Sequence, residues 1–176
     1  MVALDRFVDE LAAARIGGTY NQYAESPRAA LLRSRLAAYL DARADARILL
    51  VGEAPGYRGA RVSGVPFTSE RQLAGSGPAE ATATIVHRTL SELGVEKDVL
   101  LWNVVPTHPG TESSNRLPTA REIDAGLVFV EALTRARTLV PVGRVAERAL
   151  GVAGVRHPSH GGAKAFRAGL IECVGP

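Results

Sequence analysis

The chain of 176 residues is long enough for one domain with a sizeable core and leaves little room for a second. Hydrophobic residues make up 46% and charged residues 22%, which is typical of a globular chain and excludes wholesale disorder. The formal net charge of +3 is too small to establish nucleic-acid binding by itself. Cys173 is the single cysteine, which excludes an internal disulfide, a cysteine-based zinc finger and a cysteine-ligated iron–sulfur cluster.

Charge and hydropathy are distributed unevenly along the chain. Residues 135–167 carry seven basic side chains against the single acid Glu147, so this part is a candidate anion-binding face. The N-terminal segment has no basic stretch followed by an apolar run, and no apolar run approaches membrane-spanning length. We therefore expect a cytoplasmic protein that makes no contact with a membrane.

The first two expected elements are helices. Apolar residues at helical spacing predict an amphipathic helix over 4–15, ending before Gly17-Gly18. Pro27 opens a second helix, whose inward face carries four leucines: Leu31, Leu32, Leu36 and Leu40. We expect these helices of residues 1–45 to pack on the core of a single domain over residues 1–176.

Short apolar runs at residues 47–51, 98–105 and 138–142 are typical of buried strands. We expect a short fourth strand at residues 153–156, which runs into His157-Pro158. Helical patterns separate them, over residues 79–93, from Pro118 to about 134, and from Gly143 to about 150. This alternation predicts an α/β three-layer sandwich, in which a central, mostly parallel four-stranded sheet carries helices on both faces.

Polar segments punctuated by glycine and proline follow three of these strands. They are Gly52 to Gly56, Asn103 with Pro106 to Pro109, and His157 to Gly162. Ligands of open α/β sheets bind beyond the carboxyl ends of the strands, so one shared site is favoured over three unrelated turns. Among the histidines, His157 and His160 are three residues apart, but Pro158 and the following glycines argue against a helix that aims both at a metal ion. No metal is expected.

Taken together, these segments resemble the uracil-DNA glycosylase superfamily over about residues 46–167. Gly52-Glu53-Ala54-Pro55-Gly56 resembles the first motif of that superfamily, and Gly64-Val65-Pro66-Phe67 resembles the segment that supplies an aromatic platform under the base. Asn103 stands where the family places the amide that reads uracil. His157-Pro158-Ser159 resembles the second motif, and the stretch from Asn115 to Thr119 is also similar to members of the family.

The resemblance implies a monofunctional, monomeric glycosylase that removes uracil from DNA in base-excision repair, without a metal or organic cofactor. His157 would then donate to uracil O2, Asn103 would pair with O4 and N3–H, and Phe67 would stack on the flipped base. The other substrate-binding positions implied are Gly52, Ala54, Pro55 and Gly56. The DNA contacts implied are Ser159, His160, Gly161, Asn115 and Arg116. His160 occupies the place after Ser159 where an apolar wedge would stand, which leaves Phe166 as the candidate wedge.

Two positions depart from the best-known branch of the superfamily. Ala54 stands where that branch has the Asp that orients the attacking water, and Gly56 stands where it has the Tyr that excludes the methyl group of thymine. Glu53 is the nearest acid, and it either takes the catalytic role or only bonds the amides of the following turn. In a third alternative, backbone carbonyls near Ala54, or His108, position the water.

These departures leave two other functions open. Without a bulky side chain at Gly56 the pocket is wide enough for another deaminated base, hypoxanthine or xanthine. With Ala54 in place of the acid, the chain is alternatively a binding module for uracil or single-stranded DNA that no longer hydrolyses it.

Overall fold

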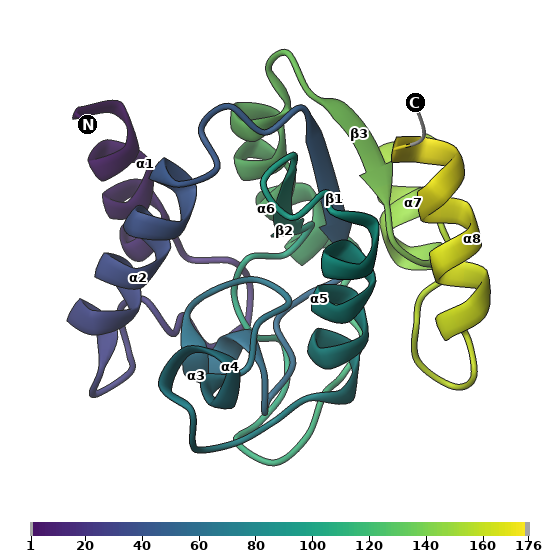
Figure 1. Ribbon diagram of the computed structural model, residues 1–176. Coiled ribbons are helices and arrows are strands. Elements are labelled where there is room, and N and C mark those ends of the chain that lie inside the picture. The colour runs from purple at the N-terminus through teal and green to yellow at the C-terminus, as the bar shows by residue number, and fades with distance from the viewer. Residues whose placement is uncertain (1, 175–176) are drawn as a thin grey trace.

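The computed structural model describes residues 2–174, and a parallel three-stranded sheet lies at its centre (Figure 1). The central strand β1 (Ile48–Gly52) pairs on one side with β2 (Val99–Asn103) and on the other with β3 (Thr138–Pro141). Every residue of β1 and β2 is buried, as parallel strands covered on both faces require. The expected α/β class and parallel sheet are confirmed.

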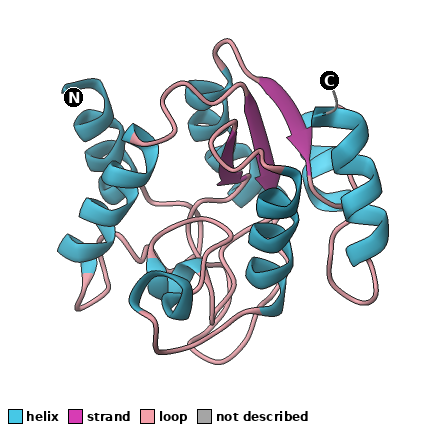
Figure 2. Ribbon diagram, viewed as in Figure 1, coloured by secondary structure: helices cyan, strands magenta, loops and turns pink. Residues whose placement is uncertain are grey.

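Helices cover both faces of this sheet, which makes the three expected layers (Figures 1 and 2). One face is covered by α1 (Val2–Ala13), α2 (Ala29–Asp41), α6 (Ala120–Thr134) and α7 (Arg144–Leu150). The other face is covered by α5 (Ala81–Leu93) and α8 (Ala163–Val174). Two short helices, α3 (Ala60–Ser63) and α4 (Glu70–Ala74), lie in the segment between β1 and α5. None of the helices within residues 2–174 is long and apolar enough to cross a membrane.

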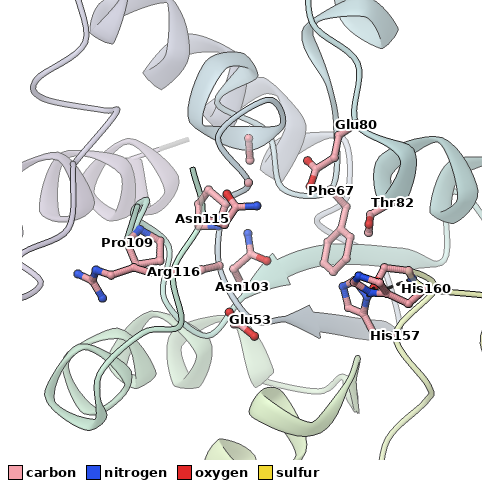
Figure 3. A pocket seen from close by; sticks show the side chains of 15 residues that line it. Glu53, Phe67, Glu80, Thr82, Asn103, Pro109, Asn115, Arg116, His157 and His160 are labelled. Atoms are coloured by element: carbon pink, nitrogen blue, oxygen red, sulfur yellow. Dashed lines mark hydrogen bonds between the residues drawn. The ribbon is translucent and has the colours of Figure 1, made fainter. Parts of the chain in front are cut away.

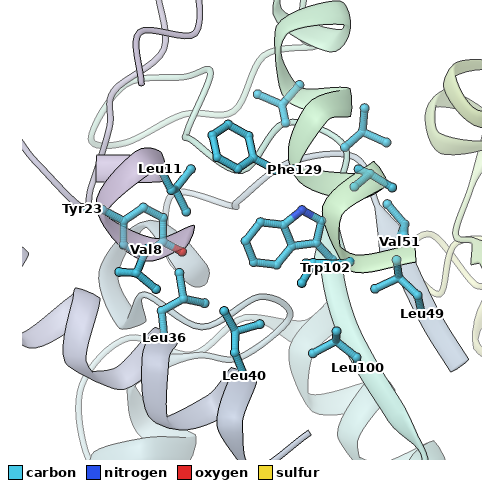
Figure 4. Close-up of a cluster of buried hydrophobic side chains, with 14 of the residues drawn as sticks. Val8, Leu11, Tyr23, Leu36, Leu40, Leu49, Val51, Leu100, Trp102 and Phe129 are labelled. Atoms are coloured by element: carbon cyan, nitrogen blue, oxygen red, sulfur yellow. The ribbon is translucent and has the colours of Figure 1, made fainter. Parts of the chain in front are cut away.

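Alternating side chains of the strands enter two separate cores. Leu49 and Trp102 point to the face of α1, α2 and α6, whereas Leu50 points to the face of α5 and α8. The Trp102 ring packs edge-on against Phe7 of α1, with 5.5 Å between the ring centroids, and Phe7 in turn packs against Phe129 of α6 (Figure 4 shows Trp102 and Phe129). The N-terminal helices therefore belong to the same packed unit as the sheet.

The expected fourth strand over 153–156 is wrong, because the sheet has three strands. Only Val155 reaches the sheet, as an isolated parallel bridge to Val142. Two hydrogen bonds hold it, from Val155 N–H to the Pro141 carbonyl and from Gly143 N–H to the Val155 carbonyl. Pro158 follows three residues later and carries no N–H, so the ladder does not extend.

Other boundaries also differ from the expectation. The first helix ends at Ala13 and not at residue 15. Leu31 is 44% exposed, whereas the remaining leucines of the same helix, Leu32, Leu36 and Leu40, are buried as expected. Helix α8, which we did not predict, buries Phe166 and Leu170 one turn apart on its inner face.

Glu122 joins three segments at the start of α6. It is 2% exposed, and its carboxylate accepts hydrogen bonds from the Gly18 N–H (3.1 Å), the Thr119 N–H (2.8 Å) and both terminal nitrogens of Arg116 (2.7 and 2.8 Å). Gly17, at φ +55°, has no side chain because a Cβ there would overlap Glu122 Cγ within 2.6 Å. Arg116 in particular lowers the pKa of Glu122 from 4.5 to about 2.

We predict that Glu122→Ala lowers the free energy of unfolding by about 3 kcal/mol, because it leaves a buried cluster of donors without their acceptor. Because the folded-state pKa is depressed, the carboxylate stabilises the fold above pH 4.5, and this contribution is lost as the pH falls toward about 2. Urea unfolding of the wild type and of Glu122→Gln across this pH range measures the pH-dependent contribution of the carboxylate, because the amide cannot ionise. Glu131→Ala, at an exposed position of the same helix, is the matched control. Equal acid sensitivity of the wild type and Glu122→Gln would contradict the assignment.

Candidate active site

A cavity of about 340 Å³ opens beyond the carboxyl ends of β1 and β2 (Figure 3). All three polar segments singled out in the sequence contribute to its wall. The predicted site residues that line it are Glu53, Ala54, Pro55, Gly56, Phe67, Asn103, Asn115, Arg116, His157, Ser159 and His160. Gly52 and Gly161 do not line it. The structure therefore places most of the predicted positions around one concave space, as binding sites in proteins usually are.

Gly52 determines the position of two cavity residues, although it does not line the cavity itself. It is paired in register with Asn103, at the last position of both strands. A Cβ on Gly52 would overlap Cζ of the Phe67 ring, and it would lie 2.8 Å from Cε2 of that ring and 3.0 Å from Oδ1 of Asn103. The aromatic ring and the amide thus occupy the space that a side chain at position 52 would need.

Phe67 is held in a strained conformation beside the strand ends. Its φ of +52° is unusual for a residue with a side chain, and such strain persists only where the surroundings enforce it. The neighbouring Ser63 hydroxyl donates to the carbonyl of Thr68 (2.6 Å), and the Thr68 hydroxyl bonds back to the Pro66 carbonyl (3.0 Å). These bonds lock the turn, so the ring is presented as a fixed flat surface.

Asn103 brings an amide into the cavity from the end of β2. The residue is only 4% exposed, yet its side chain lines the cavity and makes no hydrogen bond to another residue of the described chain (Figure 3). A buried amide normally satisfies its donors and acceptor within the protein. The arrangement leaves one acceptor and two donors available to a ligand.

His157 is fixed in one tautomer by its own turn. The backbone N–H of Ser159 donates to His157 Nδ1 (3.2 Å), and the Ser159 hydroxyl lies 2.7 Å from the same nitrogen. A backbone N–H can only donate, so Nδ1 accepts and the proton of the neutral ring is on Nε2. Desolvation, together with the charge of Arg156, lowers the pKa of His157 below its ordinary value. The ring is therefore neutral at pH 7 and offers one N–H donor.

Glu53 brings a half-buried carboxylate to the same cavity. Desolvation by burial raises its pKa above the ordinary value, and no hydrogen bond or charge within residues 2–174 opposes this shift. The alternative in which Glu53 bonds the amides of the following turn is therefore not what the structure has. Its oxygens are available to a water or to a positive charge.

The loop of residues 111–117 closes one side of the cavity. Asn115 accepts a hydrogen bond from the Tyr57 N–H (2.9 Å) through its side-chain oxygen, which joins this loop to the loop after β1. Arg116 also lines the cavity, but its guanidinium is engaged by Glu122. Arg116 therefore reaches the site as an already paired cation.

His108 lies behind the cavity wall and does not line it. The residue is fully buried, with Nδ1 2.7 Å from the Pro55 carbonyl and Nε2 2.8 Å from the Thr111 carbonyl. The ring thus lies between the carbonyls of the two loops, and its N–H donates to one of them. The alternative in which His108 positions a water is inconsistent with this geometry.

Phe166, the candidate wedge, is fully buried on the inner face of α8 and cannot enter DNA. The most exposed of the large apolar side chains of the described chain is Leu117, at 70%, next to cavity residue Arg116. The sequence did not indicate Leu117 as a candidate wedge, because an exposed leucine in a loop has no periodic pattern around it.

Fewer basic side chains of residues 135–167 are available to an anion than the composition indicates. Arg137 donates to three backbone carbonyls, those of Ala44, Ala46 and Leu133, and so serves the fold. Arg167 lies 3.5 Å from Glu92. The count of basic residues in this part therefore overstates the charge that is free for an anion.

Three cavity residues were not expected at all, Ala60, Glu80 and Thr82. Glu80 and Thr82 lie at the start of α5, about 30 residues after the strand end, where no motif marks them. Within residues 2–174, no three His, Cys, Asp or Glu side chains gather closely enough to hold a metal ion.

The comparisons with known proteins agree with this geometry. The family model of the uracil DNA glycosylase superfamily matches residues 39–170. The crystal structure of wild-type SMUG2 from Pedobacter heparinus has the same fold, with a TM-score of 0.71 at 16% identity over 97% of this chain and 95% of that one. The sequence matches no functionally curated protein at a significant level. Since the family model covers well over half of the chain, the protein belongs to the uracil DNA glycosylase superfamily of DNA glycosylases.

Proposed function

We propose that the protein is a monofunctional uracil-DNA glycosylase of base-excision repair, which needs no metal or organic cofactor. The observation that carries the proposal is the meeting of the Asn103 amide, a neutral His157 and the Phe67 ring in one cavity. A flat ring, an amide and a single N–H donor are the groups that a flipped uracil requires. A duplex hides its bases, so the uracil must leave the stack to reach them.

Recognition depends on the edge of the base. Uracil presents O4 as an acceptor and N3–H as a donor, which match the two ends of the Asn103 amide. Cytosine presents the opposite pattern, so it would leave buried polar groups unpaired and bind more weakly. The Phe67 ring would stack on the face of either base. In this proposal Asn103 therefore selects uracil over cytosine, and Phe67 holds the base by stacking on its face.

Bond cleavage produces two charges that the site must stabilise. As the bond between C1′ and N1 breaks, the electron pair moves to the base and a positive charge develops on the sugar. The Nε2–H of His157 would donate to O2 of the uracil anion, and a neutral donor does so without protonating the base. The Glu53 carboxylate would stabilise the sugar cation and orient the water that attacks C1′. The tightly partnered His108 is left out of this scheme.

The DNA strand would pass over the cavity mouth. Ser159, His160, Gly161 and Asn115 lie on the two loops that border it and are the proposed backbone contacts, joined by the paired cation of Arg116. Such contacts fix the position of the strand without reading its sequence. We propose that the protein acts on DNA as a monomer in the cytoplasm.

A second candidate substrate class is a base larger than uracil, such as hypoxanthine or xanthine, since Gly56 itself has no side chain in the cavity. The Glu80 carboxylate lies within 2.9 Å of where a Cβ of Gly56 would stand, so the structure does not favour this class over uracil. The third alternative, a module that binds uracil or single-stranded DNA without hydrolysis, is disfavoured by the position of Glu53 in the cavity.

Excision from defined oligonucleotides tests the proposal. Single-uracil DNA is incubated with the protein and treated with alkali, which cleaves the strand at an abasic site. Cleavage of uracil DNA and not of the undamaged strand is the expected result. Parallel substrates with hypoxanthine or xanthine test the second class, and binding without cleavage would identify the non-hydrolytic module.

We predict that His157→Ala lowers the single-turnover rate by about 10²-fold to 10³-fold, the scale of a lost oxyanion donor. Affinity for DNA should change little, because the donor acts mainly in the transition state. The affinity is measured with a non-cleavable uracil analogue. A near wild-type rate would remove His157 from the mechanism.

For Glu53→Gln we predict a rate lowered by about 10²-fold or more, because the amide has no charge to oppose that of the sugar. In the wild type the rate should fall on the acid side as Glu53 is protonated, at a pH above that of an ordinary carboxyl, since its pKa is raised. This acid limb should be absent from the pH profile of the variant. Full activity of Glu53→Gln at every pH would mean that neutral groups, and not the Glu53 carboxylate, orient the water.

Gly52→Ala should lower excision by about 10²-fold, because the new methyl group displaces the Phe67 ring and the Asn103 amide. The control is Gly94→Ala, where φ of +69° strains the chain but no atom lies within 4 Å of the added Cβ. Thermal unfolding of both variants separates lost stability from lost geometry. Equal excision by the two variants, matched for stability, would contradict the role of Gly52.

A further inference from the structure

His87 lies in the middle of α5 and does not line the cavity. Its ring is half-buried, and Nε2 lies 2.9 Å from the hydroxyl oxygen of Thr68. Thr68 directly follows Phe67, whose ring faces the cavity beside Asn103 and His157 (Figure 3). A helix that covers the sheet is thus joined by one side chain to the turn that carries the aromatic ring.

The direction of this hydrogen bond follows from the other partner of Thr68. The Thr68 hydroxyl has one hydrogen, which it donates to the Pro66 carbonyl at 3.0 Å, since a carbonyl can only accept. The hydroxyl oxygen then accepts from His87, so Nε2 of the ring carries a proton and donates. Each bond in the chain from His87 through Thr68 to Pro66 therefore has one donor and one acceptor.

The surroundings of His87 keep its ring neutral and place it against Phe67. Desolvation lowers the pKa of His87, and the charge of Arg43 acts in the same direction. The charge of Glu96 and the backbone of Phe67 oppose this shift without cancelling it. The ring therefore contacts the main chain of the strained residue as well as the hydroxyl that follows it.

The turn over residues 65–68 depends on such a contact because its backbone is strained. Phe67 has a φ of +52°, a conformation that persists only where the surroundings enforce it. The other side-chain hydrogen bonds of these four residues come from Ser63 and Thr68, within or next to the turn. Among the described residues, His87 is the one side chain from a distant element that bonds to the turn. It therefore fixes the turn relative to the core.

We propose that His87 is a positioning residue for base stacking, which acts through Thr68 to hold the Phe67 ring in the orientation that a flipped base requires. The inference rests on the proposed function, because it takes the face of the base as the ligand of Phe67. A ring on a relaxed turn would have to be ordered when the base binds, and such ordering weakens binding. The bond from His87 removes this cost before the base arrives.

Four single variants test this chain of hydrogen bonds. His87→Leu and Thr68→Val each remove one of its members and keep a side chain of similar size. His87→Gln places an amide N–H near the position of Nε2 and should preserve the bond. Arg88→Ala, at the exposed next position of α5, is the matched control. If His87→Leu does not fold, Thr68→Val and His87→Gln make the same comparison.

The affinities for two oligonucleotides measure the stacking. One carries a non-cleavable 2′-fluoroarabino uridine, and the other carries an abasic analogue at the same place, so their ratio reports the base alone. We expect this ratio to fall by about 5-fold to 10-fold in His87→Leu and in Thr68→Val, the range for one neutral hydrogen bond. His87→Gln and Arg88→Ala should keep the wild-type ratio. The double variant of His87→Leu and Thr68→Val should lose no more than either single variant, because both act through one bond.

Excision kinetics separate this role from a catalytic one. Stacking holds the base equally before and during bond cleavage, so His87→Leu should raise KM and leave kcat near the wild-type value. The position of the ring is measured in the free protein by ¹⁹F NMR with 4-fluorophenylalanine, in which Phe67→Leu identifies one signal among those of the four phenylalanines. That signal should shift and broaden in His87→Leu and in Thr68→Val, and should stay in place in His87→Gln.

In a protein that prefers the uracil DNA to the abasic DNA, a ratio unchanged in both His87→Leu and Thr68→Val would overturn the proposal. Additive losses in the double variant would do the same. A wild type that binds the two DNAs equally and excises no base would instead refute the proposed function. The Phe67 signal then decides the role of His87 without DNA, because an unmoved signal in both variants would show that His87 does not position the ring.

Discussion

At the end of the central strand, Gly52 leaves the space that the Phe67 ring and the Asn103 amide oxygen share. This constraint is geometric, because the parallel register puts Gly52 directly opposite Asn103 and any side chain there would fall between the amide and the ring. Both groups are held from outside the cavity, the ring by its locked turn and the amide by the β2 backbone. A flat surface and a polar edge thus meet at a fixed distance before any ligand arrives, which is what preorganised recognition needs.

Burial in the same cavity shifts the pKa values of acids and of a base in opposite directions, and no ion pair joins these groups to one another. Desolvation raises the pKa of Glu53 and Glu80 and lowers that of His157. The ring is consequently a neutral donor, while each carboxylate is an acceptor that burial has made more basic. Groups of both kinds in one low-dielectric space are suited to a reaction that separates charge between a base and a sugar. Arg116, a cation that lines the cavity, is already paired with Glu122.

Much of this arrangement could be predicted from local sequence, and the remainder depends on long-range contacts. The apolar runs of β1 and β2 are short, buried and followed by polar turns, so period and punctuation identify both strands and the edge where the site lies. The segment 153–156 has a single branched apolar residue, Val155, and Pro158 follows it, so it forms one bridge to Val142 and no strand. Phe166 illustrates the opposite error, since an aromatic residue near a motif is indistinguishable in sequence from one buried under α8.

Glu80 lies beyond such reasoning, because its meaning depends on two glycines more than 20 residues away in the chain. In the sequence, Gly56 and Gly59 resemble ordinary turn glycines, and Glu80 resembles an ordinary residue before a helix. Only the fold brings them together. The consequence for the site is that its two unpaired carboxylates come from different elements, Glu53 from the loop after β1 and Glu80 from the residue before α5. Because the elements differ, one carboxylate can be changed by substitution without moving the backbone that carries the other.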